Sequence, residues 1–317
     1  MEKLLEVKDL KVSFFTDLGE TQAVKGAGFA IGEGDFFGIV GESGSGKSVT
    51  TKSILRLGPS NCKIMGGEIL FRGEDILKKN EAELREIRGG EIAMIFQDSL
   101  SALNPVYTVG NKMVELIRRH TNMNKKEAKA RVLELLTAVG ITDPEKAMNS
   151  YPHELSGGMR QRVMIAMAMS SDPKILIADE PTTALDVTIQ AQILHLLLEL
   201  QKKNNMSIIL ITHDLGVVAQ TCKRVAVMCG GYVVEEGTVE EIFLHPGHPY
   251  TQALIASMPR VGGTFEQFLE RDLSDGNGDL CPFLNRCKYA DKTCEACLPK
   301  YYESSEGHRI FCHKREE

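Results

Sequence analysis

The chain has 317 residues, of which 43% are hydrophobic and 25% charged, with a formal net charge of -6 at pH 7. This length allows about two domains, the composition is that of a globular protein, and the negative charge argues against nucleic acid as a partner. No segment approaches the ~18 apolar residues of a membrane span or resembles a signal peptide. We therefore expect a cytoplasmic chain that reaches a membrane only by docking on other subunits.

The N-terminal part of the chain has the pattern of β-strands. Apolar and polar residues alternate over 5–14, a turn-prone stretch follows at 16–19, and a second extended segment comes next. A short apolar run at 36–40 then leads into a Gly-rich segment and a helix that we expect to end near Leu57, before Gly58-Pro59.

The Gly-rich segment at 41–48 reads GESGSGKS and fits the phosphate-loop pattern G-x-x-x-x-G-K-S/T. Its glycines let backbone N–H groups converge on a polyphosphate, because no Cβ stands in the way. Lys47 can then reach the β- and γ-phosphates, and the Ser48 hydroxyl can ligate Mg²⁺. The nucleotide-binding residues that we expect here are Ser43, Gly44, Ser45, Gly46, Lys47, Ser48 and Val49.

The middle of the chain changes to a helical pattern from about 107 to 169, which predicts a helical subdomain over about 98–168. Apolar runs at 175–178, 208–211 and 225–228 indicate parallel strands buried on both faces, with a helix over 189–200. The expected fold class is α/β: a phosphate-loop ATPase core with a mostly parallel sheet, an N-terminal antiparallel β subdomain and an inserted helical subdomain.

The C-terminal part divides differently. We expect the ATPase domain to cover 1–236, an extension and linker to cover 237–277, and a small Cys-rich, metal-binding tail to cover 278–317. Residues 262–278 are polar and rich in Gly and Asp, as linkers are, and most of the cysteines lie beyond them.

Four further segments follow the phosphate loop in a fixed order: FQD at 96–98, LSGGMRQR at 155–162, ILIADE at 175–180 and THD at 212–214. Together with that loop they resemble the ATP-binding subunits of ABC transporters over residues 1–260. The LSGG segment is the most specific, since other phosphate-loop ATPases lack it.

Each segment has a chemical reason to exist. The apolar strand ending in Asp179-Glu180 brings two carboxylates to the sheet's edge, where Asp179 can hold Mg²⁺ and Glu180 can polarise the attacking water. The resemblance implies that His213 hydrogen-bonds the γ-phosphate and that Gln97 contacts Mg²⁺ and water. It also implies that Phe14 stacks on adenine, although the neighbouring Phe15 could serve instead.

The LSGG segment precedes a helix that we expect to begin near Met159, so its N–H groups form a second anion cradle. If the family geometry holds, two nucleotide-binding subunits meet head to tail, with each ATP between one phosphate loop and the other LSGG. Asp186 then belongs to the D-loop that crosses this interface. The signature residues expected to bind the partner's ATP are Leu155, Ser156, Gly157, Gly158 and Gln161.

Residues 245–254 read HPGHPYTQAL and look like the HPxHPYT hallmark of the oligopeptide/dipeptide importer ATPases, which include nickel and some oligosaccharide importers. Its histidines could suggest metal binding, but the neighbouring prolines favour a rigid turn before a helix. The segment at 99–105 also resembles that group, with Ser99 where it usually has Pro.

The tail carries four cysteines spaced as in this subfamily, with Arg286 and His308 also at the places it uses, and the resemblance implies a 4Fe-4S cluster. A cytosolic tail too small for its own core would need such a metal staple. Disulfides do not fit a reducing compartment, whereas zinc on the C-x-x-C pair Cys294 and Cys297 is an alternative. The role could be structural or redox-regulatory. The expected cluster ligands are Cys281, Cys287, Cys294 and Cys312.

The resemblance implies the ATP-hydrolysing subunit of an importer for oligopeptides or dipeptides, at the cytoplasmic face of the cell membrane, with ATP, Mg²⁺ and the cluster as cofactors. The implied partners are a second homologous ATPase, forming a heterodimer, two transmembrane permease subunits and an extracytoplasmic solute-binding protein. Import of nickel or oligosaccharide is an alternative within the class. A non-transport ABC ATPase acting on ribosomes or DNA is disfavoured, since neither kind carries the HPY segment.

Overall fold

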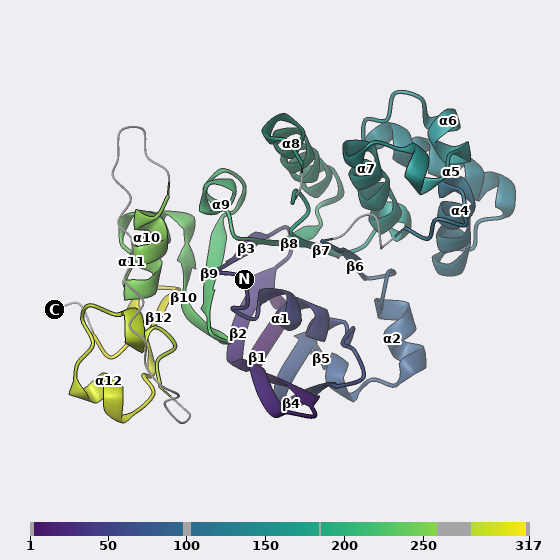
Figure 1. Cartoon of the computed structure of the whole chain (residues 1–317). Helices are drawn as coiled ribbons and strands as arrows, with labels where there is room; N and C mark the ends of the chain where they lie inside the picture. Colours follow the sequence, from purple (N-terminus) through teal and green to yellow (C-terminus); the bar gives the residue numbers. More distant parts are fainter. Residues whose placement is uncertain (1–2, 98–102, 184, 259–279, 315–317) are drawn as a thin grey trace. The chain divides into compact units, whose positions relative to one another are not determined.

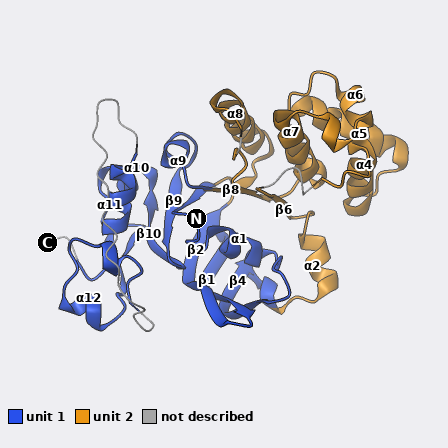
Figure 2. Cartoon of the chain, viewed as in Figure 1, with its two compact units in different colours: residues 1–32, 36–77, 212–317 blue, residues 33–35, 78–211 orange. Residues whose placement is uncertain are grey.

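A computed structural model describes residues 3–97, 103–183, 185–258 and 280–314 (Figure 1). The chain forms two compact units (Figure 2): unit 1 comprises 1–32, 36–77 and 212–317, and unit 2 comprises 33–35 and 78–211. The expected linker at 262–278 and most of the segment at 99–105 lie outside the described residues. The expected boundaries at 236 and 278 stay predictions, and the described residues on both sides of each belong to unit 1.

Unit 1 contains an antiparallel sheet in the order β2-β1-β4-β5. It is built from β1 (Lys3–Thr16), β2 (Gly19–Gly32), β4 (Cys62–Phe71) and β5 (Glu74–Asp75), followed by the 3-10 turn η1 (Ile76–Lys78). Leu5, Val7, Leu10 and Val12 of β1 are buried, so the alternation in the sequence corresponds to one face against the core. The expected antiparallel β subdomain is thus confirmed.

A second group of strands in unit 1 runs in the order β11-β12-β10-β9-β3. Strand β3 (Phe36–Val40), the last of this order, is wholly buried and parallel to β9 (Arg224–Cys229), while β10 (Tyr232–Thr238) is antiparallel to β9. The helix α1 (Lys47–Ile54) follows β3 and ends three residues before the expected Leu57, and α9 (Leu215–Thr221) precedes β9.

The C-terminal residues of unit 1 extend this strand group. The hairpin of β11 (Tyr301–Ser305) and β12 (His308–Phe311) pairs with β10, with Glu235 opposite Ile310. The helices are α10 (Val239–Leu244), α11 (Pro249–Ala256) and α12 (Lys292–Ala296), with the 3-10 turn η4 (Leu284–Arg286). Phe283 and Phe311 bury their rings against Tyr250 and Tyr232, so the tail shares a core with the strands.

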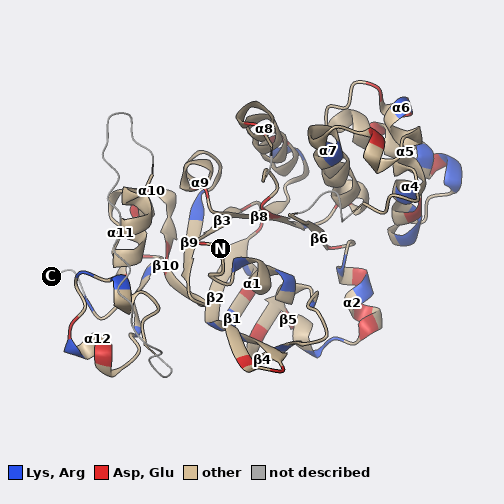
Figure 3. Cartoon of the chain, in the orientation of Figure 1, with Lys and Arg blue, Asp and Glu red and all other residues tan. Residues whose placement is uncertain are grey.

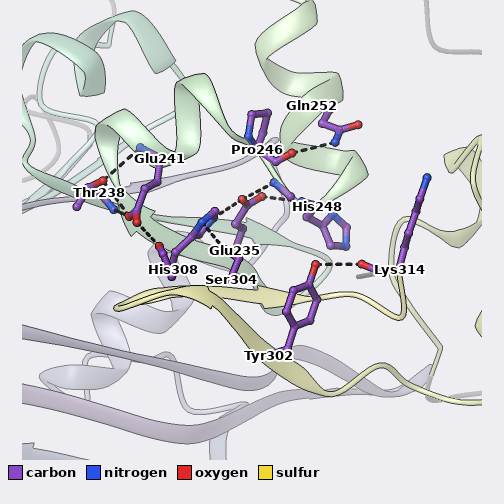
Figure 4. A network of polar contacts seen from close by, with 12 residues as sticks. Glu235, Thr238, Glu241, Pro246, His248, Gln252, Tyr302, Ser304, His308 and Lys314 are labelled. Carbon is purple, nitrogen blue, oxygen red and sulfur yellow. Dashed lines mark hydrogen bonds and ion pairs between the residues drawn. The ribbon is translucent and has the colours of Figure 1, made fainter. Parts of the chain in front are cut away.

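A buried carboxylate connects β10, the turn before α11 and β12 (Figure 4). Glu235 of β10 has no exposed surface, and its two oxygens accept hydrogen bonds from Gly247 N at 2.8 Å, His248 N at 2.9 Å and His308 Nε2 at 2.7 Å. Tyr250 N then donates to His248 Nδ1 at 3.0 Å, which caps α11. The HPY segment is therefore a rigid turn before a helix, as its prolines indicated.

Unit 2 contains a short parallel sheet in the order β8-β7-β6, formed by β6 (Ile92–Ile95), β7 (Ile175–Asp179) and β8 (Ser207–Thr212). Its helices begin on capping side chains such as Asn80, Asn124 and Ser156, as the chemistry of helix N-termini favours. They are α2 (Glu81–Ile87), α4 (Val109–His120), α5 (Lys125–Ala138), α6 (Pro144–Asn149), α7 (Gly157–Ala168) and α8 (Val187–Asn204), with 3-10 turns η2 (Pro152–Glu154) and η3 (Met169–Ser171).

The surface charges are mixed rather than separated by sign: α2, α5 and α12 each carry basic and acidic residues (Figure 3). Within the part of the chain that the structure describes, none of the helices has both the length and the apolar character needed to cross a membrane.

The Glu235 network generates a prediction about stability. Changing Glu235→Ala leaves two backbone N–H groups and a buried histidine without their acceptor, so we expect a loss of about 3 kcal/mol in unfolding free energy, measured by urea denaturation. Glu306→Ala, at an exposed turn of the same tail, should change it by less than about 0.5 kcal/mol. Equal stabilities of the two variants would contradict a fastening role for Glu235.

Candidate functional site

The Gly-rich loop lies between β3 and α1, where an anion can meet the N-terminus of a helix. Lys47 is buried, and its Nζ donates to Gly41 O at 2.7 Å and to Glu42 O at 2.8 Å, so the ammonium lies inside the curve of the loop. Gly46 occupies the N-cap of α1 with φ 99° and supplies no side-chain cap. The first turn of α1 therefore presents its N–H groups toward the loop.

Two of the loop glycines are fixed by close approach of other backbone. A Cβ on Gly41, where φ is 150°, would lie 2.1 Å from Met228 O of β9. A Cβ on Gly46 would lie 2.7 Å from Ala23 O of β2. Gly44 has positive φ as well, but nothing lies within 4 Å of its added Cβ. The loop is thus seated against β2 and β9, and only its tip is open.

In unit 2 the structure brings two of the expected site residues together. Gln97 follows β6 and Glu180 follows β7, and these parallel neighbours end at the same edge of the sheet. Gln97 Nε2 donates to Glu180 Oε2 at 3.0 Å, and Thr183 Oγ1 donates to the same oxygen at 2.8 Å. Glu180 adopts φ 47°, a left-handed conformation that few non-glycine residues take. Asp179, the last residue of β7, is fully buried.

The signature segment begins α7 earlier than expected, at Gly157 rather than near Met159, because Ser156 is the N-cap. The Ser156 side chain accepts from Met159 N at 3.3 Å and is exposed, whereas Leu155 and Gln161 are buried. At the N-terminus of α7, Ser156 is therefore the exposed signature residue, and Gly157 and Gly158 are half-buried.

Asp186, expected in the D-loop, is the N-cap of α8 and accepts from Ile189 N at 2.9 Å. A Cβ on Gly158 would lie 3.1 Å from Ile189 Cγ2, so the N-terminus of α7 packs on the first turn of α8. The signature and the D-loop are therefore neighbours within unit 2.

The remaining expected residues lie in unit 1. His213 is exposed just after β8, beside Asp214, which caps α9. Phe14 and Phe15 are both half-buried on β1, and Lys63 Nζ lies 5.1 Å from the centroid of the Phe15 ring. The phosphate loop and His213 thus belong to unit 1, and Gln97, Glu180 and the signature segment belong to unit 2.

The tail cysteines expected as ligands gather around one cavity, which His248 and His313 also line; these cysteines are Cys281, Cys287, Cys294 and Cys312. Burial raises the pKa of the Cys281 thiol to about 11. Cys297 is exposed outside this lining, with its sulfur 3.9 Å from His313 Nε2. Among the described residues, no group of three or more His, Cys, Asp or Glu is arranged to hold a metal ion.

The protein can now be compared with known ones. The family model described as ABC transporter matches residues 24–183, and that of the oligopeptide/dipeptide transporter C-terminal region matches 234–294. The oligopeptide transport ATP-binding protein OppD of Bacillus subtilis (strain 168) is 51% identical over 97% of this chain and 88% of its own length. The chain belongs to the ABC transporter family. The dipeptide transport ATP-binding protein DppD of the same bacterium is 49% identical over 98% of this chain and 95% of its own.

Solved structures agree with this assignment. The cassette MJ0796, described as a dimeric bacterial ABC transporter cassette, is 30% identical, with a TM-score of 0.67 over 74% of this chain and 98% of that one. A second structure of MJ0796, in a post-hydrolysis state bound to ADP and Pi, matches equally well. The expected ATPase cassette fold is confirmed, and this ABC protein is an ATPase.

Three contacts at these sites were not foreseen from the sequence. Thr183 contacts Glu180, while Tyr250 and Arg286 both contact Glu42 of the phosphate loop. Tyr250 lies in the HPxHPYT hallmark and Arg286 in the cysteine tail, but neither pattern indicates which distant residue the side chain contacts. Thr183 gave no signal of its own.

The glycine geometry yields a matched pair of variants. Gly41→Ala forces a Cβ into the Met228 carbonyl, so we expect it to cost more than about 2 kcal/mol of stability. Gly44→Ala adds only the cost of positive φ, about 1 kcal/mol. Thermal unfolding without nucleotide measures both, and a Gly41→Ala protein as stable as Gly44→Ala would show that the loop does not sit against β9.

Proposed function

We propose that this protein is the ATP-hydrolysing subunit of an importer for oligopeptides or dipeptides. The observation that carries the proposal is the match of 234–294 to the oligopeptide/dipeptide transporter C-terminal region, beside a cassette almost half identical to ATP-binding proteins of peptide transport. This region begins in β10, which pairs with β9 of the cassette, and Glu235 of β10 holds the turn before α11, so the region is an integral part of unit 1. The protein acts at the cytoplasmic face of the membrane as a peripheral subunit.

The phosphate loop binds the nucleotide in this proposal. Its N–H groups and Lys47 contact the phosphates, Val49 belongs to the same first turn, and Phe14 or Phe15 stacks on the adenine. Ser48, Gln97 and Asp179 supply the oxygen ligands that suit Mg²⁺, which neutralises charge on the phosphates when bound.

Hydrolysis is assigned to the residues that follow the strands. Glu180 polarises the attacking water, and the hydrogen bonds from Gln97 and Thr183 hold its carboxylate in one orientation. His213 hydrogen-bonds the γ-phosphate. The left-handed backbone of Glu180 supports a functional reading, since strained residues concentrate at active sites.

A second ATPase subunit completes each site. The twelve-residue helix α7 begins with an exposed N-cap, Ser156, and two glycines, and such a helix N-terminus suits an anion brought by another chain. The dimeric MJ0796 cassette supports such an arrangement. That second subunit is a homologous ATPase, so the pair is a heterodimer, and the further partners are two permease subunits and a solute-binding protein.

Glu180→Gln tests this mechanism. The amide keeps the size of the side chain but cannot polarise water as a carboxylate does, so ATP turnover by the transporter complex should fall about 100-fold or more with MgATP binding retained. Glu199→Gln, at an exposed position of α8, is the control and should hydrolyse at the wild-type rate. A Glu180→Gln complex with near-wild-type turnover would refute the role of Glu180.

We further propose that the tail cysteines hold a 4Fe-4S cluster. Four thiols line one cavity, and cysteine thiolates are the ordinary ligands of such clusters. A single zinc ion draws its ligands to within about 2.3 Å of one point, whereas a cluster attaches each thiolate to a different iron. The zinc alternative uses the pair Cys294 and Cys297, and Cys297 lies outside the cavity lining, so the arrangement of the thiols supports the cluster rather than zinc.

Protein purified without oxygen should be brown, with about four irons per chain. Replacing Cys281, Cys287, Cys294 or Cys312 by Ser should remove the colour, because each supplies one ligand. Cys297→Ser is the matched control and should keep it, since Cys297 lies outside the cavity lining. One zinc and no iron by elemental analysis would exclude the cluster.

A further inference from the structure

Glu42, the second residue of the phosphate loop, is held by hydrogen bonds at each of its polar groups. Its N–H donates to Tyr250 Oη at 2.9 Å, and its carbonyl accepts from Lys47 Nζ at 2.8 Å. Its carboxylate oxygens each accept from a different nitrogen of Arg286, Nη1 and Nη2, both at 2.9 Å. Two of these three partners come from the C-terminal region, more than 200 positions away in the chain.

The partners themselves are anchored. Tyr250, in the first turn of α11, is buried, and the Phe283 ring packs edge-on against it with centroids 5.4 Å apart. The Arg286 guanidinium lies 5.1 Å from the Phe283 centroid and 5.8 Å from that of Tyr250. A planar guanidinium that rests on aromatic rings and binds a carboxylate with both nitrogens has little freedom to move.

A second connection runs through the turn between β9 and β10. Gly231 N donates to Ser45 O of the phosphate loop at 3.1 Å. At the neighbouring Gly230, a Cβ would lie 2.6 Å from Pro282 Cβ, so the tail presses directly on this turn. Arg286, beside Cys287, therefore contacts the loop directly, whereas Pro282, beside Cys281, contacts the turn whose Gly231 binds the loop.

We propose that Arg286 and Tyr250 are positioning residues of the phosphate loop, through which the C-terminal region preorganises the loop for nucleotide. A Gly-rich loop has many accessible conformations, and binding an anion must order it. Fixing Glu42 beforehand reduces that cost and leaves the chemistry at Glu180 untouched. The proposal rests on the phosphate loop being the nucleotide site.

The test compares variants of the full chain, measuring MgATP affinity and, in the transporter complex, KM and kcat. Arg286→Ala should weaken MgATP binding and raise KM by roughly 3- to 10-fold with kcat little changed, given that the pair is half-exposed. Arg286→Lys should fall between Ala and wild type, because it keeps the charge and loses the two-pronged contact. Tyr250→Phe, which keeps the ring packing, should weaken binding in the same direction.

A double-mutant cycle separates positioning from general damage to the tail. If Arg286 acts through Glu42, then Glu42→Gln should weaken binding similarly, and the Glu42→Gln/Arg286→Ala double variant should be no weaker than either single one. Arg309→Ala is the matched control: this arginine of the same tail pairs with Glu236 and lies over Tyr301, without contact to the loop. Its KM should equal that of wild type.

The outcomes distinguish the two proposals. Lys47→Ala that still binds MgATP like wild type would overturn the nucleotide site itself. Lys47→Ala without binding, together with Arg286→Ala and Tyr250→Phe of unchanged KM, would overturn the positioning role alone. A fall in kcat with constant KM, or an equal effect of Arg309→Ala, would also overturn it, since either indicates partial loss of folded protein.

Discussion

The C-terminal half of unit 1 depends on one buried carboxylate. The side chain of Glu235, on β10, is fully buried, and a buried carboxylate is tolerated only where hydrogen-bond donors surround it. Those donors are the turn before α11 and His308 of the tail hairpin, two segments separated by the undescribed stretch at 259–279. Removing any donor leaves the buried carboxylate short of a hydrogen bond, so the packing of each of the three segments depends on the other two.

A chain of contacts connects Glu235 to the phosphate loop. The turn held by Glu235 starts α11 and sets Tyr250, whose hydroxyl contacts Glu42. The ring of Phe283 packs against Tyr250. The guanidinium of Arg286 lies over the Phe283 ring and binds the Glu42 carboxylate. The subfamily hallmark at 245–254 thus has a structural role that reaches the phosphate loop: His248 caps α11 through Nδ1, and His245 donates its backbone N–H to Glu241 O at the end of α10.

The sequence was a good guide wherever local chemistry decides the outcome. The β3-loop-α1 unit and the strands after the helical subdomain follow from apolar runs and glycines. It was less good where a long-range contact decides: the tail was expected as a small Cys-rich segment behind a linker, and no pattern in it indicated that β12 pairs with β10. The start of α7 shifted because Ser156 can cap a helix whose first residues are glycines, residues of poor intrinsic helix propensity. Of the signature residues, Leu155 and Gln161 are buried, which spacing alone could not tell.

The strength of the Glu42–Arg286 pair limits what it can do. Side chains 49% and 25% exposed contribute about 1 kcal/mol or less, because water and salt screen the charges. That is too little to hold the tail on the cassette, a task that falls to the buried aromatic rings and Glu235. It is enough to bias a glycine-rich loop between conformations of similar free energy. The half-exposed Glu42–Arg286 pair can therefore adjust nucleotide affinity, while the buried aromatic rings and Glu235 stabilise the fold. The fold does not depend on the weaker contact.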